Sequence, residues 1–324
     1  MRNVSFVFAS LGIVLGLAAA TPCHAQTNLH SYVSATGSGN LCTFSAPCAD
    51  LATAVAQTHA SGEISCLTGG SNSQIPVTIT RSVTIDCEGV PASQWLITIN
   101  APGIVVTLRN MTISPLGLNV GHSGYGTGVD FQNGAALFID HCVIEHWDID
   151  TPGIGISFAP PNGVTAKLHV TDSVIKNNGV AASGAGIYIL PSGSGSARVV
   201  IERTQLGNNT DGIFVNGAAS TGSILVEIKD STVANNVVDG IVAYTQAGGA
   251  IASIVVDHTS SLLNGGNGVL AQGPGAYVTL TDSSVLWNAT GLNAASGAGI
   301  FSFGNNRVAG NSNQGASPAI FALK

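Results

Sequence analysis

The segment from Lys167 to Leu190 recurs, in altered form, along most of this 324-residue sequence. If Asp172 marks one position of the repeat, the equivalent residues are Asn110, His141, Asp172, Arg203, Asp230, His258, Asp282 and Asn305. An asparagine stands six residues after each of the last six: Asn178, Asn209, Asn236, Asn264, Asn288 and Asn311. The intervals between turn positions fall from 31 to 23 residues, and short alternating strands broken by Gly and Asn fill them. This pattern predicts stacked coils of parallel β-strand and excludes helical repeats.

Stacked coils place equivalent residues about 4.8 Å apart, so that identical side chains form ladders along the stack. We therefore predict an all-β, right-handed parallel β-helix over residues 63–313. One inward-facing position loses volume from coil to coil, which predicts a barrel that tapers toward the C-terminus. Its residues are Phe131, Phe158, Ile189, Val215, Ala243, Ala271 and Ala294.

The two ends of the chain depart from the repeat. Residues 1–25 combine Arg2, an apolar run and a small-residue cleavage site, which predicts a signal peptide and a secreted or periplasmic protein. The segment Pro47–Ala60 has helical periodicity, and we expect it to cap the first coil within an N-terminal region of residues 26–62. Residues 314–324, with Ile320, Phe321 and Leu323, are expected to cap the last coil. No second apolar run is long enough to predict a membrane span.

The cysteines predict two disulfides. Five cysteines follow the signal segment, and disulfides are the usual state of cysteine in exported proteins. Cys42–Cys48 would close a short loop. Cys66–Cys87 would bridge two coils, since 21 residues are about one turn of the stack. Cys142 is left unpaired and is expected to be buried.

The charge of the chain limits its partners. Ten Lys and Arg stand against 17 Asp and Glu, a formal net charge of −7. Nucleic acids and anionic lipids are held largely by basic side chains, so neither is expected as a general partner.

Taken together, the coils, the Cys-x5-Cys loop and the cap segment resemble the exported bacterial right-handed β-helix proteins of the pectin-lyase-like superfamily. The resemblance covers Tyr32 to Asn313, and Phe138–Cys142 looks like the W-I-D-H strand of pectate lyases, with Phe for Trp. It implies action on, or binding to, extracellular polysaccharide, as a lyase or hydrolase. We also expect a monomer. The alternative is a non-catalytic adhesion or glycan-binding protein of the same fold.

One coil combines a cluster of Asp, Glu and His residues with a departure from the repeat, since Trp147 stands there in place of the ladder asparagine. Departures from a repeat are expected at functional sites. Asp148 and Asp150 of this coil, with Asp130 one coil earlier, are candidate ligands for Ca2+. The candidate catalytic residues are Asp140, with His141 or His146 as acid and base, and Arg109 or Lys167 on the adjacent coils as partners of a uronate. Trp147 is a candidate substrate contact. The competing interpretation is a solvated turn in which Trp147 shields the end of the asparagine stack.

Two further columns follow from the repeat. An outward column with Tyr188, Phe214 and Tyr244 predicts a surface on which sugars stack, unless the chain's own loops cover it. The turn column alternates in charge from Asp172 through Arg203 to Asp230, which predicts cross-strand ion pairs that hold the register.

Overall fold

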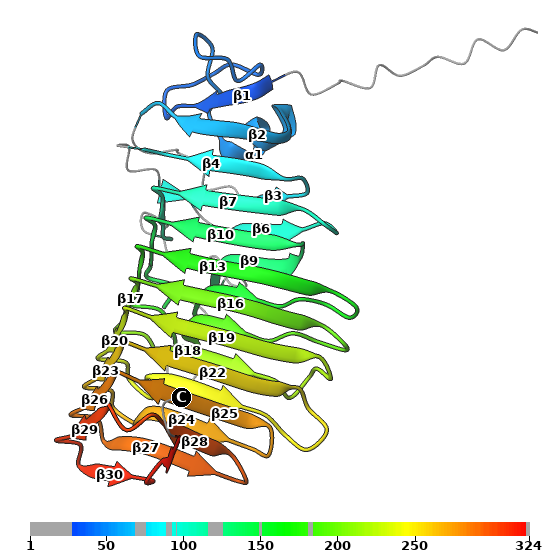
Figure 1. Ribbon diagram of the computed structural model, residues 1–324. Helices are drawn as coiled ribbons and strands as arrows, with labels where there is room; N and C mark the ends of the chain where they lie inside the picture. The colour runs from blue at the N-terminus through cyan, green and yellow to red at the C-terminus, as the bar shows by residue number, and fades with distance from the viewer. Residues whose placement is uncertain are drawn as a thin grey trace, which may run out of the picture.

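The computed structural model describes residues 28–68, 76–88, 93–94, 96–115, 126–148, 151–180 and 184–321. The predicted signal segment, Asp150 and Leu323 lie outside these residues. The described chain winds into a right-handed parallel β-helix, in which each coil contributes one strand to each of three parallel sheets (Figure 1). The predicted fold class is confirmed. No helix in the described part of the chain is long and apolar enough to span a membrane.

The largest of the three sheets has 12 strands. In spatial order they are β1 (Asn28–Val33), β2 (Thr58–Cys66), β4 (Val83–Asp86), β7 (Val105–Arg109), β10 (Ala136–Asp140), β13 (Thr165–Thr171), β16 (Ser196–Glu202), β19 (Ser223–Lys229), β22 (Ile251–Asp257), β25 (Ala276–Thr281), β28 (Gly299–Ser302) and β31 (Ala319–Ile320).

The other two sheets close the coil. The 10-stranded sheet holds β3 (Val77–Ile79), β6 (Ile97–Asn100), β9 (Thr127–Asn133), β12 (Ile154–Phe158), β15 (Ala185–Ile189), β18 (Asp211–Asn216), β21 (Ile241–Tyr244), β24 (Asn267–Gln272), β27 (Thr290–Ala295) and β30 (Asn313–Gly315). The 9-stranded sheet holds β5 (Ser93–Gln94), β8 (Thr112–Ile113), β11 (Val143–Glu145), β14 (Val174–Lys176), β17 (Gln205–Gly207), β20 (Thr232–Ala234), β23 (Ser260–Leu262), β26 (Ser284–Leu286) and β29 (Arg307–Ala309).

The core is a set of aliphatic ladders between these sheets. Alternation along each strand points every second side chain inward, and equivalent residues pair in register from coil to coil. The predicted decrease in side-chain volume is present in the 10-stranded sheet, where Phe158 pairs with Phe131 and Ala243 pairs with Ala271. The coils also shorten toward the C-terminus, as the spacing of the turn positions requires.

Buried asparagines form a continuous hydrogen-bonded ladder at the corner between the 9- and 10-stranded sheets. The Oδ1 atom of Asn209 accepts from the backbone N–H of Asn178 at 3.1 Å and from its Nδ2 at 2.9 Å. The same two contacts recur between Asn236 and Asn264, and onward to Asn311. Each amide therefore satisfies a turn N–H that the barrel wall would otherwise leave unpaired.

The N-terminal cap differs in detail from the prediction. The helix is α1 (Leu51–Gln57), and Asp50 caps it by accepting from the Thr53 N–H at 2.7 Å. The predicted bounds, Pro47–Ala60, are wrong at both ends: Pro47 precedes the capping residue, and Thr58–Ala60 already belong to β2. Both predicted disulfides, Cys42–Cys48 and Cys66–Cys87, are confirmed.

The C-terminal segment extends the stack. Strand β31 pairs in parallel with β28, so Ala319 and Ile320 add a further rung to the 12-stranded sheet. Phe321 stacks on Phe301 with ring centroids 4.8 Å apart and stays 45% exposed.

Candidate functional site

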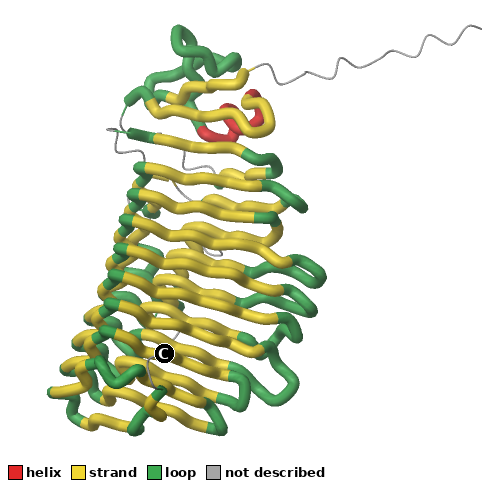
Figure 2. Tube along the Cα trace, viewed as in Figure 1, coloured by secondary structure: helices red, strands yellow, loops and turns green. Residues whose placement is uncertain are grey.

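The outer face of the 12-stranded sheet carries a shallow groove of about 660 Å³ over β10, β13, β16, β19 and β22. Four loops of six residues, 159–164, 190–195, 217–222 and 245–250, precede the last four of these strands. The corresponding loops in the neighbouring coils are shorter. Figure 2 shows the four loops projecting beside the sheet. The coils that form most of the groove are therefore the ones with the longest loops before their strands.

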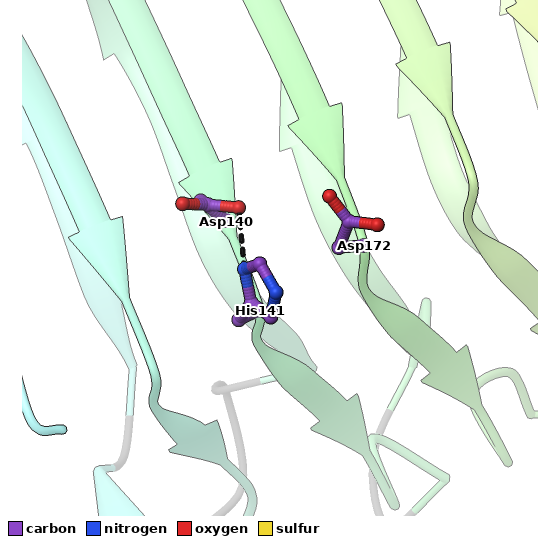
Figure 3. A group of neighbouring side chains, drawn as sticks. All are labelled: Asp140, His141 and Asp172. Atoms are coloured by element: carbon purple, nitrogen blue, oxygen red, sulfur yellow. Dashed lines mark hydrogen bonds and ion pairs between the residues drawn. The ribbon is translucent and has the colours of Figure 1, made fainter.

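A polar hollow of about 550 Å³ continues the groove toward the turn that ends these strands, and Phe138 and His169 line both. In the hollow, Asp140 accepts at Oδ1 from Nδ1 of His141, 2.7 Å away (Figure 3). Asp140 lies 3.7 Å from the Arg109 guanidinium through its second oxygen. The second ring nitrogen of His141, Nε2, lies on the side facing Asp172 (Figure 3), and the His141 side chain is 60% exposed.

Asp172 faces this group from the next coil but is held by another cation. Arg203 binds both of its carboxylate oxygens, at 2.8 Å each. The hydrogen bond from Arg203 keeps the pKa of Asp172 below its usual value. Asp140, His141 and Asp172 each present one ligand atom within 4.8 Å of the others, yet the guanidinium already neutralises Asp172.

The same arrangement recurs four coils later. His258 contacts Asp257 through Nδ1 at 2.6 Å, and its Nε2 lies 4.0 Å from Asp282. In both copies the histidine occupies a turn position with positive φ, 51° at His141 and 44° at His258. An Asp-His pair is therefore a recurring feature of this turn. The first copy differs because Arg109 and the groove adjoin it.

Two cations lie side by side in the groove without a partner of opposite charge. Lys167 of β13 and Arg198 of β16 pair in register, and their other neighbours on this ladder are Ala136 and Leu225. Neither takes part in an ion pair within 4.0 Å among the described residues. Arg198 donates to Ser223 Oγ at 3.0 Å. Like charges directly opposite each other destabilise a sheet, so this pair favours an anionic ligand.

The remaining polar side chains at the groove are those of Glu227 of β19, His169 of β13 and Ser253 of β22. The Nε2 atom of His169 is shielded from solvent and has no hydrogen-bond partner among the described residues. The ring of Phe138 lies edge-on to that of His169, with centroids 6.2 Å apart. The groove therefore offers an aromatic face next to the two cations.

The structure divides the predicted catalytic residues. Arg109, Asp140, His141 and Lys167 share the outer face of the 12-stranded sheet. His146 lies instead in a separate hollow of about 460 Å³ beside Asp148, beyond the 9-stranded sheet.

The predicted calcium ligands do not form a group among the described residues. Asp130 points outward from β9, where it accepts a hydrogen bond from Gln132. Neither it nor Asp148 belongs to the clusters of three metal-ligating side chains, and Asp150 lies outside the described residues. A calcium site at Asp130, Asp148 and Asp150 thus stays a prediction.

Trp147 does not face a ligand, which contradicts its prediction as a substrate contact. Its side chain is fully buried and takes the next place in the asparagine ladder. Its backbone N–H donates to Asn178 Oδ1 at 3.2 Å, and its indole Nε1 donates to the carbonyl of Ile113 at 3.4 Å. The Nδ2 atom of Asn178 reaches the equivalent carbonyl, that of Ile144. The indole thus replaces an asparagine amide, which supports the competing interpretation that Trp147 ends the stack.

The unpaired Cys142 is also structural. It takes the place of a hydroxyl in an interior ladder that continues with Ser173 and Thr204, and its thiol donates to the Leu108 carbonyl at 3.4 Å. Burial raises its pKa to about 12, so the nucleophilic thiolate does not form near neutral pH.

The aromatic column is on the opposite side of the coil, on the 10-stranded sheet. Tyr188 lies edge-on to Phe214 with centroids 5.2 Å apart, and Phe214 lies 6.3 Å from Tyr244. Their side chains are half-buried, and the Tyr188 hydroxyl accepts a hydrogen bond from Asn216. The column is separate from the groove, so its role in stacking sugars stays a prediction.

Sequence reasoning missed Arg198, His169 and Glu227. One signal was available for Arg198: it follows Lys167 by 31 residues, one repeat, so the two cations had to be neighbours on one ladder. The concave shape of the face gave no comparable signal.

No protein-family model matches the chain, and no curated protein matches it. Among solved structures, a crystal structure of the pectate lyase Pel9A is similar, with a TM-score of 0.56 and 11% sequence identity. The match covers 89% of this chain and 81% of that protein. At this identity the likeness establishes the β-helix fold alone.

Proposed function

We propose that this chain binds an acidic polysaccharide along the groove of the 12-stranded sheet. The observation that carries the proposal is the pairing of Lys167 with Arg198, two adjacent cations without a carboxylate partner on a chain of net charge −7. A carboxylate or sulfate of the polymer would relieve their repulsion and accept charge-assisted hydrogen bonds. Phe138 supplies an apolar face for a sugar ring.

Catalysis at the same groove would use the Asp140–His141 pair. Asp140 holds Nδ1 of the imidazole, so Nε2 is free to take or give a proton at the polymer. Arg109, 3.7 Å from Asp140, is placed to contact an adjacent carboxylate of the substrate. These roles describe a polysaccharide lyase or hydrolase, which the fold also accommodates.

A second candidate function is glycan binding without turnover. It is favoured by the Asp257–His258 pair, which repeats the local geometry away from the groove. If both pairs serve only the turns, the groove binds a polymer and leaves it intact.

We also propose that the chain is exported and acts as a monomer outside the cytoplasm. The two disulfides support an oxidising compartment, because such bonds are rare in the cytosol. Expression of the full chain, followed by N-terminal sequencing of the mature protein and its light-scattering mass, tests both statements.

Binding is tested by replacing both groove cations. Lys167→Ala with Arg198→Ala should lower the affinity for polygalacturonate about 100-fold or more, since each charge-assisted bond contributes about 1.5 kcal/mol or more. The matched control, Lys229→Ala with Arg307→Ala, removes the same charge from residues that do not line the groove. Equal losses in the two double variants would refute the groove as the binding site.

Turnover is tested with a second matched pair. His141→Ala should abolish depolymerisation and retain binding, whereas His258→Ala should leave both unchanged. Product size and the ultraviolet absorbance of an unsaturated product end distinguish hydrolysis from elimination in a panel of acidic and neutral polysaccharides. Full activity of His141→Ala, or no turnover by the native protein on any polymer that it binds, would favour the second candidate function.

A further inference from the structure

The half of the groove next to the cations is aliphatic and open to water. Leu225 of β19 is 46% exposed and pairs directly with Arg198, while Val255 of β22 is 38% exposed and pairs with Glu227. Ile251 of the same strand is 54% exposed. Large side chains of this kind, gathered beside a charged site, mark a surface that contacts an apolar partner.

The hydroxyl-rich backbone of a polysaccharide does not account for this surface. Sugars meet proteins mainly through polar groups and aromatic faces, and the aromatic ring of this groove, Phe138, lies near its other end. The aliphatic pair would stay in contact with water or with hydroxyl groups. Burying it against hydrocarbon instead is favourable in proportion to the apolar area removed from water.

We infer that the groove takes an acidic polysaccharide that carries ester-linked acyl groups. The acyl chain would lie over Leu225 and Val255, while the acidic group of the same or the next residue meets Lys167 and Arg198. Charge complementarity and the direct pairing of Arg198 with Leu225 place the two contacts on neighbouring strands. The groove volume of about 660 Å³ leaves room for a short chain beside a sugar ring. This inference rests on the proposed binding of an acidic polysaccharide.

The test compares one acidic polymer in three forms: unsubstituted polygalacturonate, its O-acetyl ester and its O-hexanoyl ester, at equal degrees of substitution. Each methylene that the groove buries should raise the affinity about fourfold, so the hexanoyl form binds most tightly. Leu225→Thr with Val255→Thr should remove this dependence on chain length and leave the affinity for the unsubstituted polymer unchanged. Threonine retains the branched shape that suits a strand.

Val105→Thr is the control variant. Val105 is 40% exposed on β7, in the same ladder as Leu225 but outside the groove, and its replacement should leave the ester preference intact. Circular dichroism and melting midpoints confirm that the variants fold.

The outcomes separate the two claims. Equal affinity for all three forms, or an ester preference that survives Leu225→Thr with Val255→Thr, would overturn the acyl-group inference and leave acidic-polysaccharide binding in place. Failure of every form to bind would refute the proposed function itself. Tight binding of free decanoate that none of the polymers displaces would also overturn the inference, because the apolar surface would then serve a free fatty acid.

Discussion

The buried carboxyl group of Asp211 should make this protein less stable as the pH rises from 4 to 7, because its ionised form is unfavourable in the folded state. The carboxyl group lies in β18 and is 8% exposed, and burial raises its pKa to about 6 from an ordinary 3.8. Among the described residues it accepts one hydrogen bond, from the Asp239 N–H at 2.9 Å, and the nearby charge of Asp239 adds to the pKa shift. One hydrogen bond does not replace the water that a carboxylate loses on burial.

The direction of the effect follows from proton linkage. Because the folded-state pKa lies above the unfolded one, the folded protein binds more protons between pH 4 and 6. This contribution to stability is fully present below pH 4 and is lost as the pH rises through 6. A shift of about two units corresponds to about 3 kcal/mol at pH 8. Asp211→Asn keeps an oxygen acceptor for the Asp239 N–H and removes the charge, so it should recover most of that loss.

Urea unfolding of the native protein and of Asp211→Asn at pH 4, 6 and 8 measures the effect. The variant should gain up to about 3 kcal/mol at pH 8 and little at pH 4. Asp230→Asn, at an exposed turn position with positive φ, removes the same charge without burial and should show no such dependence. A variant that is destabilised at pH 8, or a gain shared by Asp230→Asn, would refute the reasoning.

Three further predictions concern the ladder, the cross-coil disulfide and calcium. Asn236→Ala should lower the free energy of unfolding in urea by about 3 kcal/mol or more, because it leaves buried polar groups of Asn209 and Asn264 without their hydrogen-bond partner. Asn235→Gly, at an exposed position with positive φ, should cost little, and similar losses in the two variants would argue against the ladder. Replacing both Cys66 and Cys87 by Ser should cost about 3 kcal/mol, since the disulfide closes a 21-residue loop, and an unchanged melting midpoint would contradict this. Calcium should raise the melting midpoint of the native protein and not that of Asp148→Ala; equal shifts would exclude Asp148 as a ligand.

The fold was predictable because the repeat records it directly. Stacked strands bring residues one repeat apart into contact, so the spacing of Asn209 and Asn236 in the sequence already states that they are neighbours. The same logic identified the Cys66–Cys87 bridge. The helix bounds were less predictable, because Thr58–Ala60 continue a helical pattern but begin strand β2, in which Thr58 pairs with Asn28 of β1.

The site was predictable only in part. Arg109, Asp140 and Lys167 fall on one face because they occupy outward positions of the same sheet, which the two-residue period of a strand dictates, and His141 follows Asp140 in the turn that ends β10. Trp147 misled for a physical reason. An indole N–H and an asparagine amide can donate to the same kind of carbonyl, so a departure from the repeat preserved its hydrogen bond.

By itself, the sequence determined the coil, its ladders and the pairing of its cysteines, because these depend on distances along the chain that stacking converts into contacts. Only the tertiary structure decided that one of these ladders lies in a groove. Lys167, Arg198 and Leu225 line that groove together with residues of five strands, and Phe138 and His169 join it to the hollow around Asp140. The groove depends on the size and packing of side chains from several coils, which the spacing of the repeat does not encode.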